Sequence, residues 1–277
     1  SQFKEGPYRG TSVNVDEAGF RFSKNQGPWP PDPKNVNIFF FGGSTTFGYG
    51  VADDQTIPSY LQEFLDDSGK DVFVYNFGRG YYFSTQELVL FEKLLANEFV
   101  PEIAIFIDGI NDMDNLTNEP KFSEKISLLF NAPAQSGALS GLPLINLLKS
   151  LRLDPPAQSI AKDYAKQKNV EDIVKRYMRN KRLIEAAAEK FGVLPVFVWQ
   201  PAPTYKYDLT YNLFGNHNKL QNHSTALGYP YMAQYVAEHD MGNNFLYLAN
   251  AQENLKKPLY VDPLHYTAEF SQEIARR

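Results

Sequence analysis

Three stretches of this sequence follow the same order: a short apolar run, a polar loop that contains glycine, and then apolar residues at helical spacing. The apolar runs cover residues 36–41, 72–76 and 103–107. Strands that are apolar on both faces are typical of parallel sheets, and helices that alternate with strands join such strands. Further apolar runs at 193–199 and 245–248 extend the pattern. The sequence therefore predicts an α/β fold of three layers, with a parallel sheet of about five strands between helices.

One domain is expected to hold most of the chain. A chain of 277 residues with 43% hydrophobic content can bury a large core. Residues 1–35 are polar and rich in glycine and proline, and the prolines at 28–33 exclude a helix or a central strand there. We interpret them as an extended lead-in packed on the domain. Residues 36–277 then form a single domain, with an insertion at about 113–168 where the alternation of strands and helices breaks.

The composition excludes several classes of partner. The formal net charge of −5 provides no basic surface for nucleic acid. No apolar run is long enough to span a bilayer, so no transmembrane segment is expected in this chain. The sequence contains no cysteine, and its four histidines include no pair spaced as a metal site on one helical face. We therefore expect neither a metal ion nor another cofactor, and the sequence indicates no particular oligomeric state.

The first apolar run ends at two glycines followed by Ser44. Glycine permits a sharp turn, and a serine directly after it presents its hydroxyl and its own N–H in one direction, as a nucleophile requires. A simple Gly-Gly-Ser turn at a strand end fits the same residues. The loop lacks the lysine of a phosphate-binding loop and the G-x-G-x-x-G of a dinucleotide site, and Thr46 replaces the last glycine of G-x-S-x-G. Ser44 therefore needs partners elsewhere in the chain.

Polar residues that follow strands are candidates for those partners. In an open α/β sheet the residues directly after the strands share one edge, which places Ser44, residues 78–81 and Asn111 together. Acyl transfer needs a nucleophile, a base, a group that orients the base, and donors for the oxyanion. Among the histidines, only His265 has a carboxylate at a spacing that could orient it, which is Asp262 three residues before. The pattern favours a catalytic triad of serine, histidine and aspartate.

Three short motifs resemble those of the SGNH hydrolases, which are also called GDSL-type lipases and esterases. The motifs are Gly43-Ser44-Thr45, Gly109-x-Asn111-Asp112 and Asp262-x-x-His265, in this order along the chain. The resemblance extends from about residue 36 to the C-terminus. It implies the flavodoxin-like SGNH hydrolase fold, with Ser44 as nucleophile, His265 as general base and Asp262 as the residue that orients it. It also implies an oxyanion hole formed by Ser44, Gly80 and Asn111.

The sequence departs from the family pattern at two positions. Gly43 stands where these proteins usually have an aspartate before the serine, and the mechanism implied here does not need that aspartate. The family's second motif has a glycine about five residues after an asparagine. Counted from Asn76 this position is Tyr81, with Gly80 one residue earlier. We assign the backbone donor to Gly80, while a register without a gap assigns it to Tyr81.

The resemblance implies an enzyme that cleaves carboxylic esters through an acyl-enzyme intermediate. The expected substrate is a small-molecule or glycan ester that carries an acyl or acetyl group. Two alternatives use the same fold: an O-acyltransferase acting on a glycan, and a non-catalytic carbohydrate-binding module. The tyrosine-rich residues 205–211 could stack on a sugar in either case. A generic α/β domain without a site is the third alternative.

The lead-in also carries a prediction about location. Its residues Asn14, Gly19, Phe20 and Arg21, ahead of the first strand, resemble those of secreted, periplasmic or membrane-tethered members of the family. We therefore expect an extracytoplasmic location.

Overall fold

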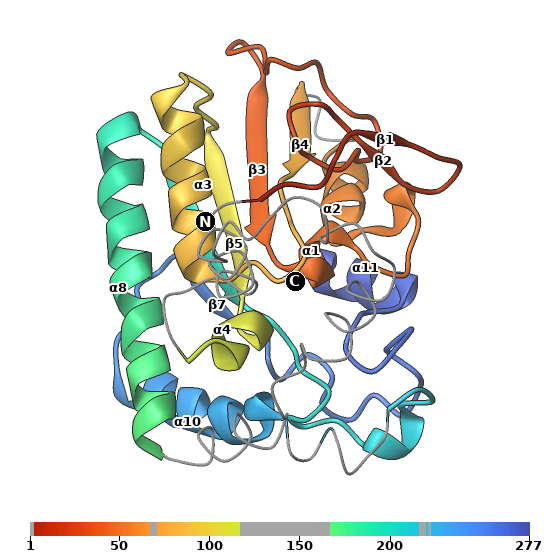
Figure 1. Ribbon diagram of the computed structural model, residues 1–277, viewed down its shortest axis with the longest axis vertical. Helices are drawn as coiled ribbons and strands as arrows, with labels where there is room; N and C mark the ends of the chain where they lie inside the picture. Colours follow the sequence, from red (N-terminus) through yellow and green to blue (C-terminus); the bar gives the residue numbers. More distant parts are fainter. Residues whose placement is uncertain (1–2, 67–70, 117–166, 216–219, 221–222) are drawn as a thin grey trace, which may run out of the picture.

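A five-stranded parallel sheet forms the centre of the protein (Figure 1). The structure is a computed structural model that describes residues 3–66, 71–116, 167–215, 220 and 223–277. In spatial order the strands are β4 (Val72–Asn76), β3 (Val36–Gly42), β5 (Ile103–Asp108), β6 (Leu194–Trp199) and β7 (Phe245–Tyr247). Every neighbouring pair is parallel. The predicted fold class is confirmed.

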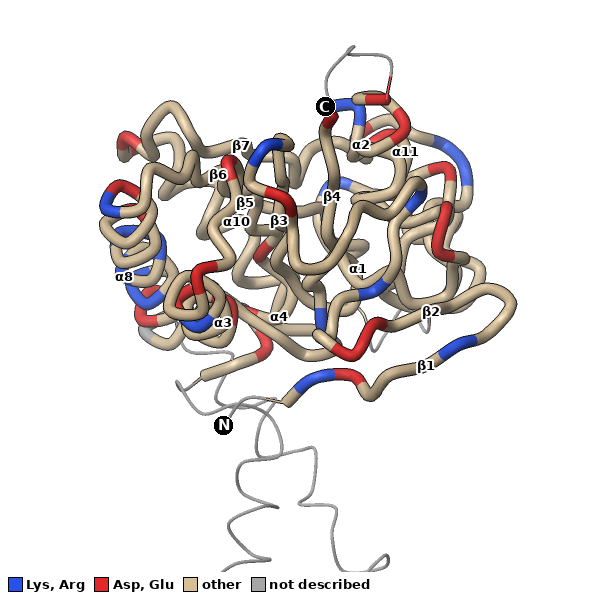
Figure 2. The backbone as a smooth tube through the Cα atoms, turned by 90° about the horizontal axis from the view of Figure 1, so that it is seen from above, with Lys and Arg blue, Asp and Glu red and all other residues tan. Residues whose placement is uncertain are grey.

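Helices cover both faces of the sheet, which Figure 2 shows from above. The helices α3 (Ser84–Ala96) and α8 (Gln167–Phe191) pack together on one face, and α2 (Ile57–Asp66) and α11 (Ala268–Arg276) on the other. Two further helices, α4 (Ile110–Asp114) and α10 (Ser224–Glu238), contact each other beyond the carboxyl ends of the strands. The result is the three-layer arrangement that the alternating pattern predicts.

Aromatic side chains on the α3 face hold the strands in register. Phe41, Phe106 and Phe197 are direct neighbours in β3, β5 and β6. Their rings stack, with centroids 4.8 Å apart between Phe41 and Phe106 and 5.4 Å apart between Phe106 and Phe197. A slip of one residue would turn these rings to the opposite face, so the stack ties strand register to core packing. The ends of the strands, where the candidate site residues follow, are fixed in consequence.

The lead-in lies along the α3 side of the domain and includes a short antiparallel pair, β1 (Tyr8–Arg9) and β2 (Asn14–Val15). Phe20 is buried in the aromatic core, where its ring lies 5.2 Å from that of Trp29. The guanidinium of Arg21 is also buried and donates to the carbonyls of Phe47 and Gly48. These carbonyls follow the short helix α1 (Ser44–Phe47), so the lead-in supports the segment that carries Ser44.

Two sequence-based expectations about helix starts are wrong. The spacing of Ser84 and Glu87 predicts a capping box for α3, but Ser84 is the first helical residue and its hydroxyl donates to Asp112 at 2.6 Å. The sequence also predicts a helix near residues 231–239, but the helix begins earlier, at Ser224, with His223 as its N-cap and Pro230 inside it. In both cases a contact or cap made in the folded chain overrides a local preference.

Most of the expected insertion, residues 117–166, lies outside the described residues. Two 3-10 turns, η1 (Asp53–Gln55) and η2 (Leu209–Tyr211), complete the described elements. Within the described ranges, no helix has the length and apolar character needed to cross a membrane.

Candidate active site

The carboxyl ends of three strands meet around one cavity of about 220 Å³. Ser44 follows β3, Tyr81 lies in the loop after β4, and Asn111 follows β5. His265 reaches the same cavity from the segment before α11. The full lining comprises Ser44, Thr45, Tyr49, Tyr81, Ile110, Asn111, Asp114, Gln200, Leu264 and His265. The fold therefore brings together the residues that the sequence analysis placed at one edge of the sheet.

Hydrogen bonds connect Ser44, His265 and Asp262 in a line. The Ser44 Oγ lies 2.8 Å from His265 Nε2, and His265 Nδ1 lies 2.6 Å from Asp262 Oδ2. With a proton on Nδ1, the imidazole donates to the carboxylate and accepts the serine hydroxyl proton at Nε2. This is the arrangement that activates a serine nucleophile.

The segment that carries Asp262 and His265 is a tight turn closed by its own backbone. The Val261 N–H donates to the His265 carbonyl at 2.8 Å. Asp262 Oδ1 in turn accepts the N–H groups of Leu264 and His265, each at 2.8 Å. Partial burial opposes ionisation of Asp262, but these two N–H groups and the His265 ring together lower its pKa below the ordinary value. Asp262 therefore stays a carboxylate that orients the imidazole.

Gly43 allows the closest approach between the serine turn and Asn111. A Cβ atom at residue 43 would lie 2.2 Å from Asn111 Nδ2, so a larger residue would displace the amide. The Asn111 amide donates one of its two hydrogens to the Tyr82 carbonyl at 2.7 Å. Its second hydrogen can serve a ligand in the cavity, which Asn111 lines.

Gly80 and Tyr81 occupy different surroundings. Tyr81 lines the cavity and Gly80 does not, as far as the described residues show. A Cβ atom at residue 80 would lie 2.5 Å from Tyr49 Oη, so Gly80 makes room for the Tyr49 ring. Tyr81 has a φ of 64°, a left-handed conformation that glycine more often supplies. Of the two residues, Tyr81 is therefore the one that the loop brings to the cavity.

Gln200 also lines the cavity, although it is not one of the site residues predicted from the sequence. Its Oε1 accepts hydrogen bonds from Thr45 Oγ1 at 2.6 Å and from Tyr266 Oη at 3.0 Å. These bonds link the serine turn to the residue after His265. Gln200 directly follows β6, so the rule that ligands bind at the carboxyl ends of strands would have found it.

Two more lining residues were also missed, namely Tyr49 and Asp114. The Tyr49 ring lies 5.3 Å from the His265 ring. Asp114 Oδ1 accepts the hydroxyl of Ser224 and lies 3.4 Å from His223 Nε2. No group of three or more metal-ligating side chains occurs in the described part of the chain. The site therefore offers hydroxyl, imidazole, amide and carboxylate groups for chemistry.

Two carboxyls, Glu87 and Asp108, are fully buried behind this site. They interact with each other and with Asp112, and no other donor contacts either of them among the described residues. Burial, together with the neighbouring acids, raises the pKa of both carboxyls well above their ordinary values. Each therefore favours the protonated form in the folded protein.

This burial predicts a stability that falls as the pH rises. Above the pKa of the unfolded chain, about 4 for such groups, unfolding releases protons that the folded protein retains. The free energy of unfolding should then fall by up to about 1.4 kcal/mol per pH unit for each retained proton. Glu87→Gln removes one of these titrating groups, so the free energy of unfolding of the variant should fall less with pH than that of the parent. Urea unfolding should therefore show that the variant gains stability relative to the parent between pH 5 and pH 7. Glu92→Gln, at an exposed position of α3, is the control. An equal difference at both pH values would refute the buried-acid account.

The fold and the site together define a class of three-layer α/β proteins in which a serine directly after a central strand is hydrogen-bonded to a histidine, and the histidine to an aspartate. No protein-family model matches the sequence, and a search of the curated proteins finds no match. Among solved structures, the chain is similar to a lipase from a goat rumen metagenome. The two have a TM-score of 0.52 and 10% identity, over 88% of this chain and 96% of that one.

Two other similar structures come from named bacteria. One is a lipolytic protein of the G-D-S-L family from Desulfitobacterium hafniense, with 15% identity, a TM-score of 0.46, and coverage of 87% of this chain and 99% of that one. Another is a psychrotrophic esterase from a Pseudoalteromonas species, with 12% identity, a TM-score of 0.42, and coverage of 87% and 93%. The likeness to the goat rumen lipase shows a shared fold, and the predicted three-layer α/β fold with a five-stranded parallel sheet is confirmed.

Proposed function

We propose that this protein is a serine hydrolase that cleaves carboxylic esters through an acyl-enzyme intermediate. The observation that carries the proposal is the continuous line from Ser44 Oγ through His265 to Asp262, which opens into a cavity. A Gly-Gly-Ser turn that merely ended a strand would not require an imidazole nitrogen 2.8 Å from the serine hydroxyl. The protein that shares the fold with this chain is named a lipase, which is consistent with ester chemistry.

The mechanism follows from the positions of the proton donors and acceptors. His265 Nε2 takes the Ser44 proton while Oγ attacks the ester carbonyl carbon, and the carbonyl π electrons move to oxygen. The N–H groups of Ser44 and Tyr81 and the Asn111 amide stabilise that oxyanion. When the tetrahedral intermediate collapses, the C–O bond to the alcohol breaks and His265 gives its proton to the leaving oxygen. Water, activated by the same imidazole, then releases the carboxylate and restores Ser44.

The cavity favours an ester with a short acyl group and a polar alcohol part. Its volume of about 220 Å³ is small for a long acyl chain. Asp114, Gln200 and Asn111 contribute polar groups to the wall, while Ile110 and Leu264 contribute apolar surface. We propose an acetyl or other short acyl ester of a hydroxylated alcohol, which includes acetylated glycans.

A panel of esters tests this proposal. Acetyl, butyryl, octanoyl and acetylated-glycan esters are compared by kcat/KM, with the Ser44→Ala protein as the control for background hydrolysis. We expect turnover of the acetyl esters and a decline with chain length. Product analysis with a glycan acceptor present separates hydrolysis from transfer of the acyl group. If the parent hydrolyses no ester of the panel faster than buffer alone, ester hydrolysis is the wrong function. Turnover that Ser44→Ala retains in full would instead rule out Ser44 as the nucleophile.

We also propose an extracytoplasmic location, for which the sequence of the lead-in is the support.

A further inference from the structure

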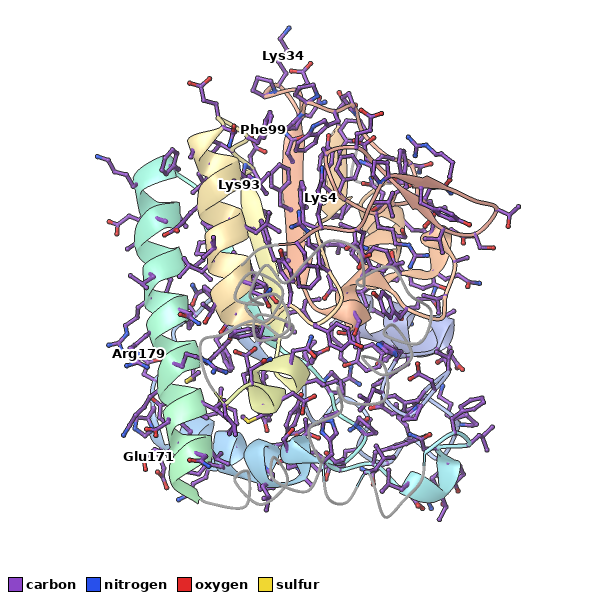
Figure 3. All side chains as sticks on the ribbon, in the orientation of Figure 1. Lys4, Lys34, Lys93, Phe99, Glu171 and Arg179 are labelled. Carbon is purple, nitrogen blue, oxygen red and sulfur yellow. The ribbon has the colours of Figure 1, made fainter. Side chains whose placement is uncertain are left out.

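A second cavity, of about 460 Å³, lies between the lead-in and α3. It shares no lining residue with the cavity at Ser44. The lead-in contributes Phe3, Lys4, Ala18 and Trp29, and residues 90–99 contribute the opposite wall. Figure 3 labels Lys4, Lys93 and Phe99, which lie on the face of the molecule formed by α3 and the lead-in. The candidate catalytic chemistry makes no use of this cavity.

The walls of this second cavity combine apolar surface with positive charge. Trp29 and Phe99 form an aromatic pair with ring centroids 4.8 Å apart, and Leu90 and Leu94 of α3 add aliphatic surface. The charged lining residues are Lys4, Arg79 and Lys93, and no acidic residue is among the described lining. A ligand that matches this wall has an apolar body and a negative group.

Arg79 is the cation that most needs a negative partner. Its side chain is only 5% exposed. Nη1 donates to the Phe3 carbonyl at 2.9 Å and to Tyr82 Oη at 3.0 Å, while Nε has no hydrogen-bond partner. No carboxylate of the described residues forms an ion pair with it, in contrast to the buried Arg21, which pairs with Asp53 at 2.7 Å. A buried guanidinium without a counter-ion is unfavourable, and a carboxylate is the anion that a guanidinium pairs with best.

Gly19 leaves room for the aliphatic part of Lys4 and for the Arg79 guanidinium beside the same turn of the lead-in. A Cβ atom at Gly19 would lie 2.9 Å from the Lys4 side chain and 3.4 Å from Arg79 Nη2, and its φ of 92° also suits glycine. Lys4 Nζ donates to the Glu17 carbonyl at 2.6 Å, which leaves two of its three N–H groups for other acceptors.

We propose that this cavity binds an amphipathic carboxylate, with its charged group at Arg79 and its hydrocarbon part against Trp29 and Phe99. Lys4 and Lys93 lie at the rim, where exposed amines attract the anion and strengthen its binding. The site goes beyond the proposed esterase function, because it needs neither Ser44 nor His265. The competing interpretation is that Arg79 serves only to anchor the lead-in through the Phe3 carbonyl.

Trp29 provides a direct readout of binding. The chain has two tryptophans, and the other, Trp199, is fully buried in a different apolar cluster. A bromine atom quenches tryptophan fluorescence only at short range, so ω-bromodecanoate bound in this cavity should quench Trp29. We expect saturable quenching with the parent and equal quenching with Ser44→Ala, which separates this site from the catalytic cavity. Bromodecanol, which lacks the charge, and inorganic phosphate, which lacks the chain, should bind at least about tenfold more weakly.

Charge-reversal variants at exposed positions test the role of the cations without disturbing the core. Lys93→Glu should weaken binding about tenfold, because an attraction at the rim becomes a repulsion. Lys34→Glu changes the charge equally at an exposed position of the lead-in outside the cavity, and should leave binding unchanged. Arg79→Gln should weaken binding about 30-fold or more, through loss of a charge-assisted pair. If Arg79→Gln fails to fold, the comparison of Lys93→Glu with Lys34→Glu decides.

Three results would overturn the proposal. The first is an absence of saturable quenching with the parent protein. The second is binding of bromodecanol or phosphate as tightly as the carboxylate. The third is an equal effect of Lys93→Glu and Lys34→Glu. Loss of ester hydrolysis in Ser44→Ala with retained quenching would leave both the esterase and this binding site standing, whereas retained hydrolysis in that variant would rule out only Ser44 as the nucleophile.

Discussion

Replacing Ser44 or His265 by alanine should each lower kcat for a short-chain ester by about 10⁴-fold or more. Ser44 Oγ and His265 Nε2 lie 2.8 Å apart and act on the same proton, so removal of either one disables both. The double variant should be no slower than either single variant, because the losses are not additive within such a unit. Steady-state kinetics on an acetyl ester measures all three.

A histidine elsewhere provides the matched control for this experiment. His239 is exposed at the end of α10 and does not line the Ser44 cavity, so His239→Ala should retain the parent kcat. Circular dichroism should show that each variant is folded. A Ser44→Ala protein that hydrolyses esters at the parent rate would rule out Ser44 as the nucleophile.

Replacing Asn111 by alanine should reduce kcat by about 10²- to 10³-fold, or 2.7 to 4 kcal/mol of barrier, which is the effect of losing one oxyanion donor. The loss should fall on kcat more than on KM, since the donor acts on charge that develops in the transition state. Asn111→Asp should be similarly slow, because it exchanges the N–H donor for an acceptor. Thermal unfolding must accompany the kinetics, since Asn111 also donates to the Tyr82 carbonyl. A decrease of less than tenfold would remove Asn111 from the oxyanion hole.

The sheet was predictable because the signal of a buried parallel strand lies in neighbouring residues. The runs that became β3, β4 and β5 are mostly apolar, and each ends at a polar loop. The start of α10 was not predictable in this way. Pro230 usually argues against a helix interior, but here the helix begins at Ser224 with a cap from His223 and extends past it.

In the candidate site, too, some residues are predictable from local sequence and others only from the tertiary arrangement. The spacing of Asp262 and His265 is local, so the sequence indicates that pair directly. The meeting of Ser44 with His265 joins residues 221 positions apart, and only the sheet topology makes it predictable. The assignment to Gly80 shifts the family's motif by one residue so that a glycine fills the position, whereas the unshifted count gives Tyr81, which is the residue that lines the cavity.

The burial of charged residues could not be predicted from the sequence. Arg79, Glu87 and Asp108 read as ordinary polar residues of loops and helices, yet all three are buried. Whether a charge is exposed depends on packing between distant segments, such as the lead-in against α3. The domain boundaries and the extracytoplasmic location remain predictions.

Labelling with a fluorophosphonate tests the central claim most directly. The reagent phosphonylates a serine whose hydroxyl is activated by a base, and fluoride leaves. Mass spectrometry of the digested protein should find a single adduct per chain on the peptide that contains Ser44, with none in Ser44→Ala and little in His265→Ala. An adduct on another residue, or an unlabelled protein that still hydrolyses esters, would contradict the account.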